Sequence, residues 1–185
     1  MKLRIISGIY GGRFISAPKS NLTRPTTEKV KGAIFNSLSN FFDFEEALVL
    51  DIYAGSGALG FEALSRGAKE IHFVEKNFVP LENLRNNIKN LEVEDQCKVF
   101  KDTAVRYLNN LNLNRYDLIL ADPPFFEFDI HQVYNKVVNG NILSENGFLL
   151  IERSVQTFKQ DFEVFKIEPY KIIGDSYIYL HKNTI

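Results

Sequence analysis

The sequence is poor in several features that mark particular classes of protein. Its one cysteine, Cys97, excludes an internal disulfide and a zinc site built from several thiolates. Its three histidines, His72, His131 and His181, are far apart and lack the spacing of metal ligands. No run of about 18 apolar residues exists, and the start MKLRIISG is too short and polar for a signal peptide. We therefore expect a soluble cytoplasmic protein, monomeric by default, without a metal site.

The net charge of −1 hides an uneven distribution of charge along the chain. Residues 1–31 hold seven basic residues and one acidic residue, whereas residues 32–185 hold 15 basic and 22 acidic residues. An arm of net charge +6 on a body of net charge −7 indicates a polyanionic partner for the arm. A solvated amino-terminal extension would carry the same charge, so charge alone leaves both interpretations open.

Segments typical of strands and helices alternate along most of the chain. The stretch RIISGIYGGRFISAP at 4–18 predicts a β-hairpin. The spacing of Val30, Ile34, Leu38 and Phe41 predicts a helix over 26–40 with these side chains on one face. Further strands are predicted at 47–52, 70–75, 97–100, 116–121, 147–152, 166–173 and 176–182. Further helices are predicted at 58–66, from the cap Asn77 to Leu91, at 103–111 and at 129–139.

This alternation is typical of a parallel sheet with helices on both faces. The last two strands are joined by a short turn at Gly174-Asp175, so they must be antiparallel to each other. We therefore predict a doubly wound, Rossmann-like α/β sheet with a terminal antiparallel hairpin. We assign residues 1–40 to an amino-terminal arm and residues 41–185 to the sheet domain. Ligands of such sheets bind beyond the carboxyl ends of the strands.

The first candidate site motif is LDIYAGSGALG at 50–60, which ends a strand and opens a helix. Gly55, Gly57 and Gly60 match the dinucleotide pattern G-x-G-x-x-G, although a tight strand-to-helix turn would also use glycines. Here Asp51 ends the strand before Ala54 and the glycines, which gives D-x-x-x-G-x-G. A carboxylate at this point accepts from a cationic ligand group and disfavours a pyrophosphate.

Acids follow the next two strands as well. Glu75 ends its strand where acidic residues accept from both hydroxyls of a ribose. Asp102 follows the third strand and either accepts from an adenine amine or caps a helix, and the two interpretations are nearly equal in weight. Three successive acids suit a cofactor with an α-amino group, a ribose diol and an adenine. S-adenosylmethionine fits this description.

The second motif, ADPPF at 121–125, follows the fourth strand, which lies beside the first in a doubly wound sheet. Asp122 and the carbonyl of Pro123 are expected to accept from the two hydrogens of an amine on a base ring. Pro124 fixes the direction of that carbonyl, and Phe125 is expected to stack on the base. For an isolated Asp-Pro-Pro-Phe a plain loop is the better interpretation, but the upstream D-x-x-x-G-x-G turn favours a catalytic site.

Over nearly its whole length the chain resembles the bacterial small-subunit ribosomal RNA guanine-2-amino methyltransferases, the RsmD family. The resemblance lies in RIISGIYGGR, RPTTEKVKGAIFNSL, LDIYAGSGALGFEALSRGA, FVEKN and ADPPF. It implies a class I methyltransferase fold, S-adenosylmethionine as methyl donor, and ribosomal RNA or an assembling small subunit as partner. It also implies that Thr26 lies near the cofactor, and we assign Arg13, Arg24 and Lys29 of the basic arm to RNA. Gly32, where the family usually has Glu, and the stretch FEFD after Phe125, which has no basic residue, depart from the family pattern.

Three alternatives stay open at this point. An adenine-6-amino DNA methyltransferase would use the same Asp-Pro-Pro-Phe, but 185 residues leave little room for a DNA-recognition domain. A non-catalytic RNA-binding protein with a vestigial cofactor pocket is disfavoured by the intact acids. A nicotinamide oxidoreductase would bind NAD and not S-adenosylhomocysteine.

Overall fold

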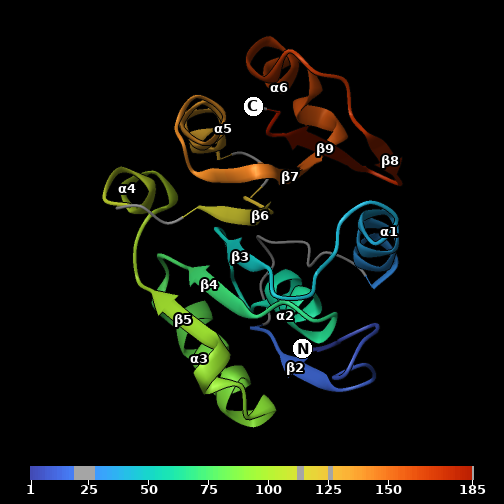
Figure 1. The fold of residues 1–185 in the computed structure, drawn as a ribbon, viewed down its shortest axis with the longest axis vertical. Coiled ribbons are helices and arrows are strands. Elements are labelled where there is room, and N and C mark those ends of the chain that lie inside the picture. The colour runs from blue at the N-terminus through green and yellow to red at the C-terminus, as the bar shows by residue number, and fades with distance from the viewer. Residues whose placement is uncertain (19–27, 112–114, 125–126, 185) are drawn as a thin grey trace.

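The computed structural model describes residues 1–18, 28–111, 115–124 and 127–184, and Figure 1 shows their arrangement. Within these ranges, one sheet has the strand order β5-β4-β3-β6-β7-β9-β8, and β1 and β2 form a separate hairpin. The strands are β1 (Lys2–Arg4), β2 (Phe14–Ser16), β3 (Leu48–Asp51), β4 (Glu70–Val74), β5 (Cys97–Phe100), β6 (Tyr116–Ala121), β7 (Leu143–Ser154), β8 (Lys171–Ile173) and β9 (Ser176–Lys182). The helices are α1 (Glu28–Leu38), α2 (Ala58–Ser65), α3 (Phe78–Leu91), α4 (Ala104–Asn109), α5 (Asp129–Asn139) and α6 (Phe158–Phe165).

The sheet separates two layers of helices, with α1, α2 and α3 on one face and α4, α5 and α6 on the other (Figure 1). Successive side chains of a strand point to opposite faces, so each strand serves both layers. Val49 of β3 packs in the cluster of the first layer, and its neighbour Leu50 packs in the cluster of the second. The central strands are therefore apolar on both faces, as expected for a covered parallel sheet.

The predicted doubly wound sheet and its terminal antiparallel hairpin are confirmed. Strands β3 to β7 run parallel, and β6 lies beside β3 with Leu50 opposite Ile119. Strand β9 runs antiparallel to both β7 and β8. This order places the first and fourth strands of the parallel set side by side at the switch point.

Three details of the predicted elements are wrong. Helix α6 was not predicted, although Phe158, Phe162 and Phe165 have helical spacing, and it shortens the expected strand at 166–173 to Lys171–Ile173. Helix α1 ends at Leu38, so Phe41 lies beyond it and its side chain is 43% exposed. Asn77 is the N-cap residue of α3 as predicted, but a side-chain cap is wrong, because its side chain forms no capping hydrogen bond.

The amino-terminal hairpin and α1 pack into the main body of the protein. Ile5, Ile15 and Ile34 belong to the same buried cluster as Val49 and Leu118 of the sheet. The boundary at residue 40 therefore stays a prediction, while the packing on both sides of it is continuous. Within the described ranges, no helix combines the length and apolar character that a membrane crossing requires.

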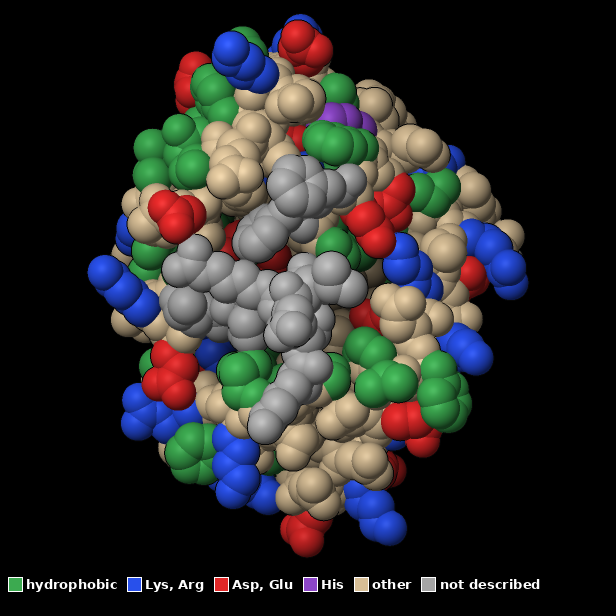
Figure 2. Space-filling view, turned by 180° about the vertical axis from the view of Figure 1, so that it is seen from behind, with side chains coloured by type: hydrophobic (Ala, Val, Ile, Leu, Met, Phe, Trp, Pro, Cys, Tyr) green, Lys and Arg blue, Asp and Glu red, His purple; other side chains and the backbone are tan. Residues whose placement is uncertain are grey.

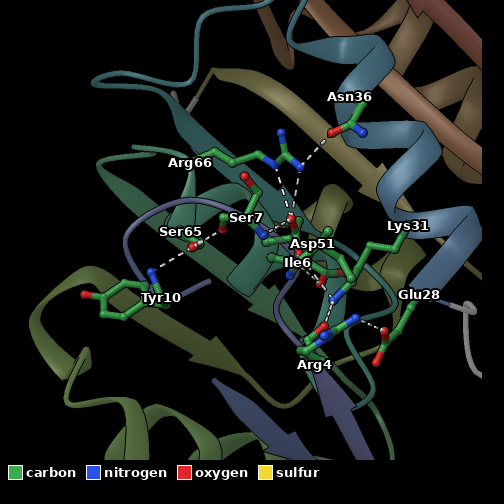
Figure 3. Close-up of polar contacts among 12 residues, drawn as sticks. Arg4, Ile6, Ser7, Tyr10, Glu28, Lys31, Asn36, Asp51, Ser65 and Arg66 are labelled. Carbon is green, nitrogen blue, oxygen red and sulfur yellow. Dashed lines mark hydrogen bonds and ion pairs between the residues drawn. The ribbon is translucent and has the colours of Figure 1, made fainter. Parts of the chain in front are cut away.

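The carboxylate of Glu62, on α2, contacts both the hairpin and α1. Figure 3 labels its partners Ile6, Ser7 and Lys31. Its Oε2 accepts from the Ile6 backbone N–H at 2.8 Å, and its Oε1 accepts from that of Ser7 at 3.2 Å. The Lys31 ammonium lies 3.3 Å from Oε2 and also donates to the Arg4 carbonyl at 2.8 Å. Burial lowers the pKa of Lys31, and the charge of Glu62 opposes that shift. Both side chains are almost fully buried. The Lys31 charge therefore depends on Glu62, whose Oε1 also accepts from Arg66 Nη2 at 3.2 Å.

We expect Glu62→Gln to lower the free energy of unfolding by about 3 kcal/mol, because it leaves the buried Lys31 charge without its counter-ion. Urea denaturation monitored by circular dichroism measures this loss. Glu46→Gln is the matched control, because it removes the same charge from an exposed pair in which Lys69 Nζ lies 2.6 Å from Glu46 Oε2. The control should unfold like the wild type. Equal midpoints for the two variants would contradict the anchoring role of Glu62.

Candidate active site

A pocket of about 190 Å³ lies beyond the carboxyl ends of the parallel strands. Residues 51–56, at the end of β3 and just after it, form one part of its wall. Residues at the ends of β4, β5 and β6 and residues of the amino-terminal hairpin form other parts. The predicted site residues that line it are Asp51, Ala54, Gly55, Glu75, Asp102, Asp122, Pro123 and Pro124. Residues from four adjacent strand ends thus meet in one cavity. Figure 2 shows a face of the molecule with acidic atoms visible in the hollow at its centre.

Other predicted site residues lie elsewhere. Gly57, Arg13 and Lys29 do not line the pocket. Arg24, Thr26 and Phe125 lie outside the described residues, so their assignments stay predictions.

Gly57 shapes the turn between β3 and α2. Its φ is +84°, and its N–H donates to the Ala54 carbonyl at 2.7 Å. A Cβ at this position would lie 2.5 Å from the Phe61 ring and 2.6 Å from Leu84, so only glycine fits without a shift. Gly57 therefore packs against Phe61 and Leu84 of the core and does not line the pocket.

Asp51 is the most deeply buried acid of the pocket, with 1% of its surface exposed. Its Oδ2 accepts from the Gly60 N–H at 2.9 Å, while Oδ1 forms no hydrogen bond with any described residue. Burial raises the pKa of Asp51 to about 7, the Gly60 hydrogen bond opposes this shift, and the charge of Glu75 adds to it. The carboxyl group is therefore poised to ionise when a cation enters the pocket.

Glu75 connects the end of β4 to the glycine turn. Its Oε2 accepts from the Gly55 N–H at 3.0 Å, and its Oε1 accepts from the Asn77 N–H at 2.6 Å. Each carboxylate oxygen has a second lone pair, so both can still accept from a ligand hydroxyl. Glu75 thus shapes the pocket wall in addition to its predicted role toward a ribose.

Asp102 lines the pocket but is not the cap of α4. The cap is Thr103, whose side chain accepts from the Arg106 N–H at 3.3 Å. Asp102 Oδ1 instead accepts from the Thr103 N–H at 2.8 Å and lies 3.1 Å from Arg106 Nε. The helix-cap interpretation is therefore wrong in its simple form, and the predicted contact with an adenine amine stays a prediction.

The loop after β6 forms the opposite wall of the pocket with Asp122, Pro123 and Pro124. The Glu127 N–H donates to the Pro124 carbonyl at 3.0 Å, which closes a turn. Both carboxylate oxygens of Glu127 accept from Lys76 Nζ, at 2.7 and 2.8 Å. This ion pair joins the loop after β6 to the end of β4.

Several lining residues were not predicted from the sequence. The hairpin contributes Met1, Leu3, Ala17 and Pro18, which become neighbours of the strand ends only through tertiary packing. Tyr53, Lys76, Glu127 and Asp129 also line the pocket. A systematic reading of the residues next to each motif would have found Tyr53 and Lys76, because each lies within two positions of a predicted site acid.

Arg13, assigned to RNA from the charge of the arm, has structural partners. Its guanidinium donates to the Asn90 carbonyl at 2.7 Å and to the Leu91 carbonyl at 3.3 Å, at the carboxyl end of α3. Its guanidinium also lies 5.7 Å from the centre of the Tyr10 ring. A cation at this end of a helix compensates the helix dipole. Substituting Arg13 would therefore disturb α3 as well as any RNA contact.

The described residues contain no group of three or more His, Cys, Asp or Glu side chains that could hold a metal ion. The buried His72 belongs to a hydrogen-bonded group in the core, in which its Nδ1 lies 2.8 Å from Tyr116 Oη and its Nε2 lies 2.5 Å from Glu70 Oε1. Burial lowers the pKa of His72, which is typical of a neutral core histidine.

Two features of the sheet define the class I methyltransferase fold. They are the strand order and the antiparallel strand β9, which lies between β7 and the edge strand β8. The solved structure of yhhF from Escherichia coli has a TM-score of 0.81 at 26% identity and covers 100% of this chain and 99% of its own. The structure of HI0767 from Haemophilus influenzae has a TM-score of 0.75 at 27% identity, with 100% of both chains covered.

The family model described as "Conserved hypothetical protein 95" matches residues 3–182. Among curated relatives, the ribosomal RNA small subunit methyltransferase D of Haemophilus influenzae is 33% identical over 82% of this chain and 78% of its own. The ribosomal RNA small subunit methyltransferase D of Escherichia coli is 30% identical over 84% of this chain and 76% of its own. The chain therefore belongs to this family, the RsmD family, and the predicted family resemblance is confirmed.

Proposed function

We propose that the protein transfers a methyl group from S-adenosylmethionine to the exocyclic 2-amino group of a guanine in small-subunit ribosomal RNA. The observation that carries this proposal is the convergence of Asp51, Glu75, Asp102 and Asp122 from four strand ends on one pocket. Relatives that are named small-subunit ribosomal RNA methyltransferases supply the substrate class. The free RNA and the assembling subunit are both candidate partners.

The donor set of the pocket suits S-adenosylmethionine. Asp51 would hold its α-ammonium group through Oδ1, Glu75 would hold the ribose hydroxyls, and Asp102 would accept from the adenine amine. When bound, the cofactor supplies an electrophilic methyl group on its sulfonium. The glycine turn beside Ala54 lets the backbone approach the ligand closely.

Asp122 and the Pro123 carbonyl would orient the substrate amine. An amine on a base ring is a weak nucleophile, because its lone pair is delocalised into the ring. Two acceptors for its hydrogens favour a more tetrahedral nitrogen and direct its lone pair toward the methyl donor. Phe125, outside the described residues, is proposed to stack on the extruded base.

The outward face of the hairpin is a better candidate for RNA phosphates than Arg13. Lys2, Arg4 and Phe14 are exposed on this two-stranded sheet, while Ile15 points into the core. Arg4 Nη2 lies 2.8 Å from Glu28 Oε2, at the start of α1. The exposed Lys29 follows Glu28 in the chain and is therefore close to this face. Figure 2 shows basic side chains gathered over the hairpin at the lower left. The hairpin also reaches the pocket, so RNA bound here would lead to the catalytic centre.

The raised pKa of Asp51 predicts a pH-dependent affinity for S-adenosylhomocysteine, which carries the same α-ammonium group. With a pKa of about 7, Asp51 is mostly protonated at pH 6 and mostly ionised at pH 8. Affinity should therefore rise roughly tenfold between these two pH values. Calorimetry across this range measures it. Asp51→Asn should bind more weakly and show no such dependence, and a parallel pH profile for the two proteins would contradict the role of Asp51.

Denaturation provides a control that does not depend on the ligand. The folded pKa of Asp51 lies above its unfolded value of 3.8, so the folded state favours the protonated form. The stability contribution of Asp51 is therefore lost as the pH rises from about 4 to about 7. Asp51→Asn should have a higher free energy of unfolding than the wild type at pH 8.

Asp122→Ala should slow methyl transfer to small-subunit ribosomal RNA by roughly tenfold or more, because one charged hydrogen bond to the amine is lost. Affinity for S-adenosylhomocysteine should change little, since Asp122 is assigned to the substrate side. Single-turnover transfer of labelled methyl groups tests this, followed by mapping of the modified base.

Asp95→Ala is the matched control, because Asp95 is an exposed aspartate in the short helical turn Glu94–Gln96, outside the pocket. A native rate for Asp122→Ala would exclude the amine-orienting role. Absence of transfer by the wild type to free RNA and to subunits would overturn the proposed function itself.

Replacing Lys2 and Lys29 by Ala should reduce the salt dependence of RNA binding by somewhat less than one unit of log–log slope per lost phosphate contact. Binding measured across a salt series tests this. The charge-matched control is Lys69→Ala with Lys182→Ala, because these exposed lysines lie near the amino-terminal ends of the parallel strands, whereas the pocket lies beyond their carboxyl ends. Identical slopes for wild type and both double variants would mean that another face contacts the RNA.

A further inference from the structure

Four buried polar side-chain atoms of the described residues have no hydrogen-bond partner: Tyr53 Oη, Asp129 Oδ1, Arg153 Nη2 and Tyr179 Oη. A buried polar atom without a partner destabilises the folded state, so each one calls for an explanation. Two of them, Tyr53 and Asp129, belong to residues that line the pocket. The other two do not.

Tyr53 and Asp129 lie on the substrate side of the pocket. Asp51 of β3 is opposite Leu120 of β6, and the Ile52 N–H donates to the Leu120 carbonyl at 2.9 Å. Continuation of this register by two residues places Tyr53 opposite Asp122. Asp129 begins α5, at the end of the loop that starts with Asp122. Both residues therefore flank the proposed site of the reacting amine.

The two side chains form an adjacent donor and acceptor. Burial, the nearby charge of Asp129 and a hydrogen-bonding contact with its carboxylate raise the pKa of Tyr53 far above its usual value, so its hydroxyl keeps its proton. The carboxylate is close enough to affect that pKa, yet Tyr53 Oη and Asp129 Oδ1 do not meet in a regular hydrogen bond. A ligand that presents a donor beside an acceptor would satisfy both groups.

Arg153 contacts the segment that precedes Asp129. Its Nε donates to Asp161 Oδ2 at 2.9 Å, its Nη1 lies 3.5 Å from the Glu127 carbonyl, and its guanidinium is 5.7 Å from the centre of the Phe128 ring. Arg153 is 1% exposed. The segment that leads into Asp129 is therefore held against a buried cation, which fixes the position of the carboxylate.

We propose that Asp129 and Tyr53 read the N1–O6 edge of the guanine whose 2-amino group is held by Asp122, an inference that rests on the proposed function. On this edge the 2-amino group, the N1–H donor and the O6 acceptor follow one another. Asp129 accepts from N1–H, and the Tyr53 hydroxyl donates to O6. Adenine presents an acceptor at N1, which the Asp129 carboxylate cannot pair with, and an amine at position 6, which cannot accept from the Tyr53 hydroxyl. Adenine also lacks the 2-amino group. A site built in this way rejects the wrong base strongly.

The test uses 2-aminopurine, which keeps the 2-amino group but lacks both N1–H and O6. Small-subunit particles are reconstituted with RNA that carries guanine or 2-aminopurine at the mapped methylation position, and kcat/KM is measured for each. The wild type should prefer guanine by about 100-fold or more, from two lost hydrogen bonds, one of them charged. Tyr53→Phe should lose about tenfold on guanine and little on 2-aminopurine. Asp129→Asn should lose activity on guanine and gain on 2-aminopurine, because an amide can donate to N1 of the analogue.

Tyr179→Phe is the matched control, because it removes a second buried and unpartnered hydroxyl that does not line the pocket. It should leave the guanine preference unchanged, and all three variants should bind S-adenosylhomocysteine within about twofold of the wild type. An unchanged guanine preference in Tyr53→Phe and Asp129→Asn, or the same loss in Tyr179→Phe, would overturn the inference. If the wild type is active but either of these outcomes is found, the guanine-edge inference fails and the proposed function stands. An inactive wild type would overturn the inference and the proposed function together.

Discussion

The buried carboxylate of Glu62 is the interaction on which the shape of the pocket depends most. It accepts from two backbone N–H groups of the hairpin and pairs with Lys31 of α1, while its own helix begins at the glycine turn. One side chain therefore joins the hairpin, α1 and α2, and Ser65 and Asn87 hold the hairpin through further hydrogen bonds. The hairpin in turn supplies the apolar pocket residues Met1 and Leu3. A buried charge carries a large desolvation penalty unless it is fully partnered, so this junction tolerates few alternatives.

The acids of the pocket serve the fold and the ligand together. Asp51 and Glu75 each accept from backbone N–H groups of the segment that begins with the glycine turn. These hydrogen bonds hold the turn in place, and they also reduce the cost of burying carboxylates. The bonds do not remove that cost, because the pKa of Asp51 remains raised to about 7. A cationic ligand group beside Asp51 would compensate its charge further.

Much of this fold follows from local patterns. Apolar runs alternate with amphipathic segments, and this alternation predicts parallel strands, two helical layers and a shared edge for Asp51, Glu75, Asp102 and Asp122. The pocket contains all four. Local patterns were less informative where a segment had two periodicities. The residues of α6 lie next to a strand-like stretch, and the helical spacing of its phenylalanines competes with that pattern.

The roles of individual charges depended on contacts between distant parts of the chain. The charge of the arm suggested that Arg13 faces RNA, but Arg13 donates to carbonyls at the end of α3, 77 and 78 residues away. Lys31 appeared to be one more basic residue of the arm, and it is buried against Glu62. The composition of a segment gives its number of charged residues. It does not show which of these residues form ion pairs or hydrogen bonds in the folded protein.

The sequence by itself determined the order of strands and helices and the acids at the strand ends, because these depend on periodicity and on short-range turn chemistry. Only the tertiary structure decided that the hairpin lines the pocket and that Asp51 is buried enough to hold its proton near neutral pH. It also decided that Tyr53 Oη and Asp129 Oδ1 are buried beside each other without a regular hydrogen bond. The physical reason is that burial and hydrogen-bond satisfaction are set by side chains brought together from separate elements. Such properties emerge only when the layers pack.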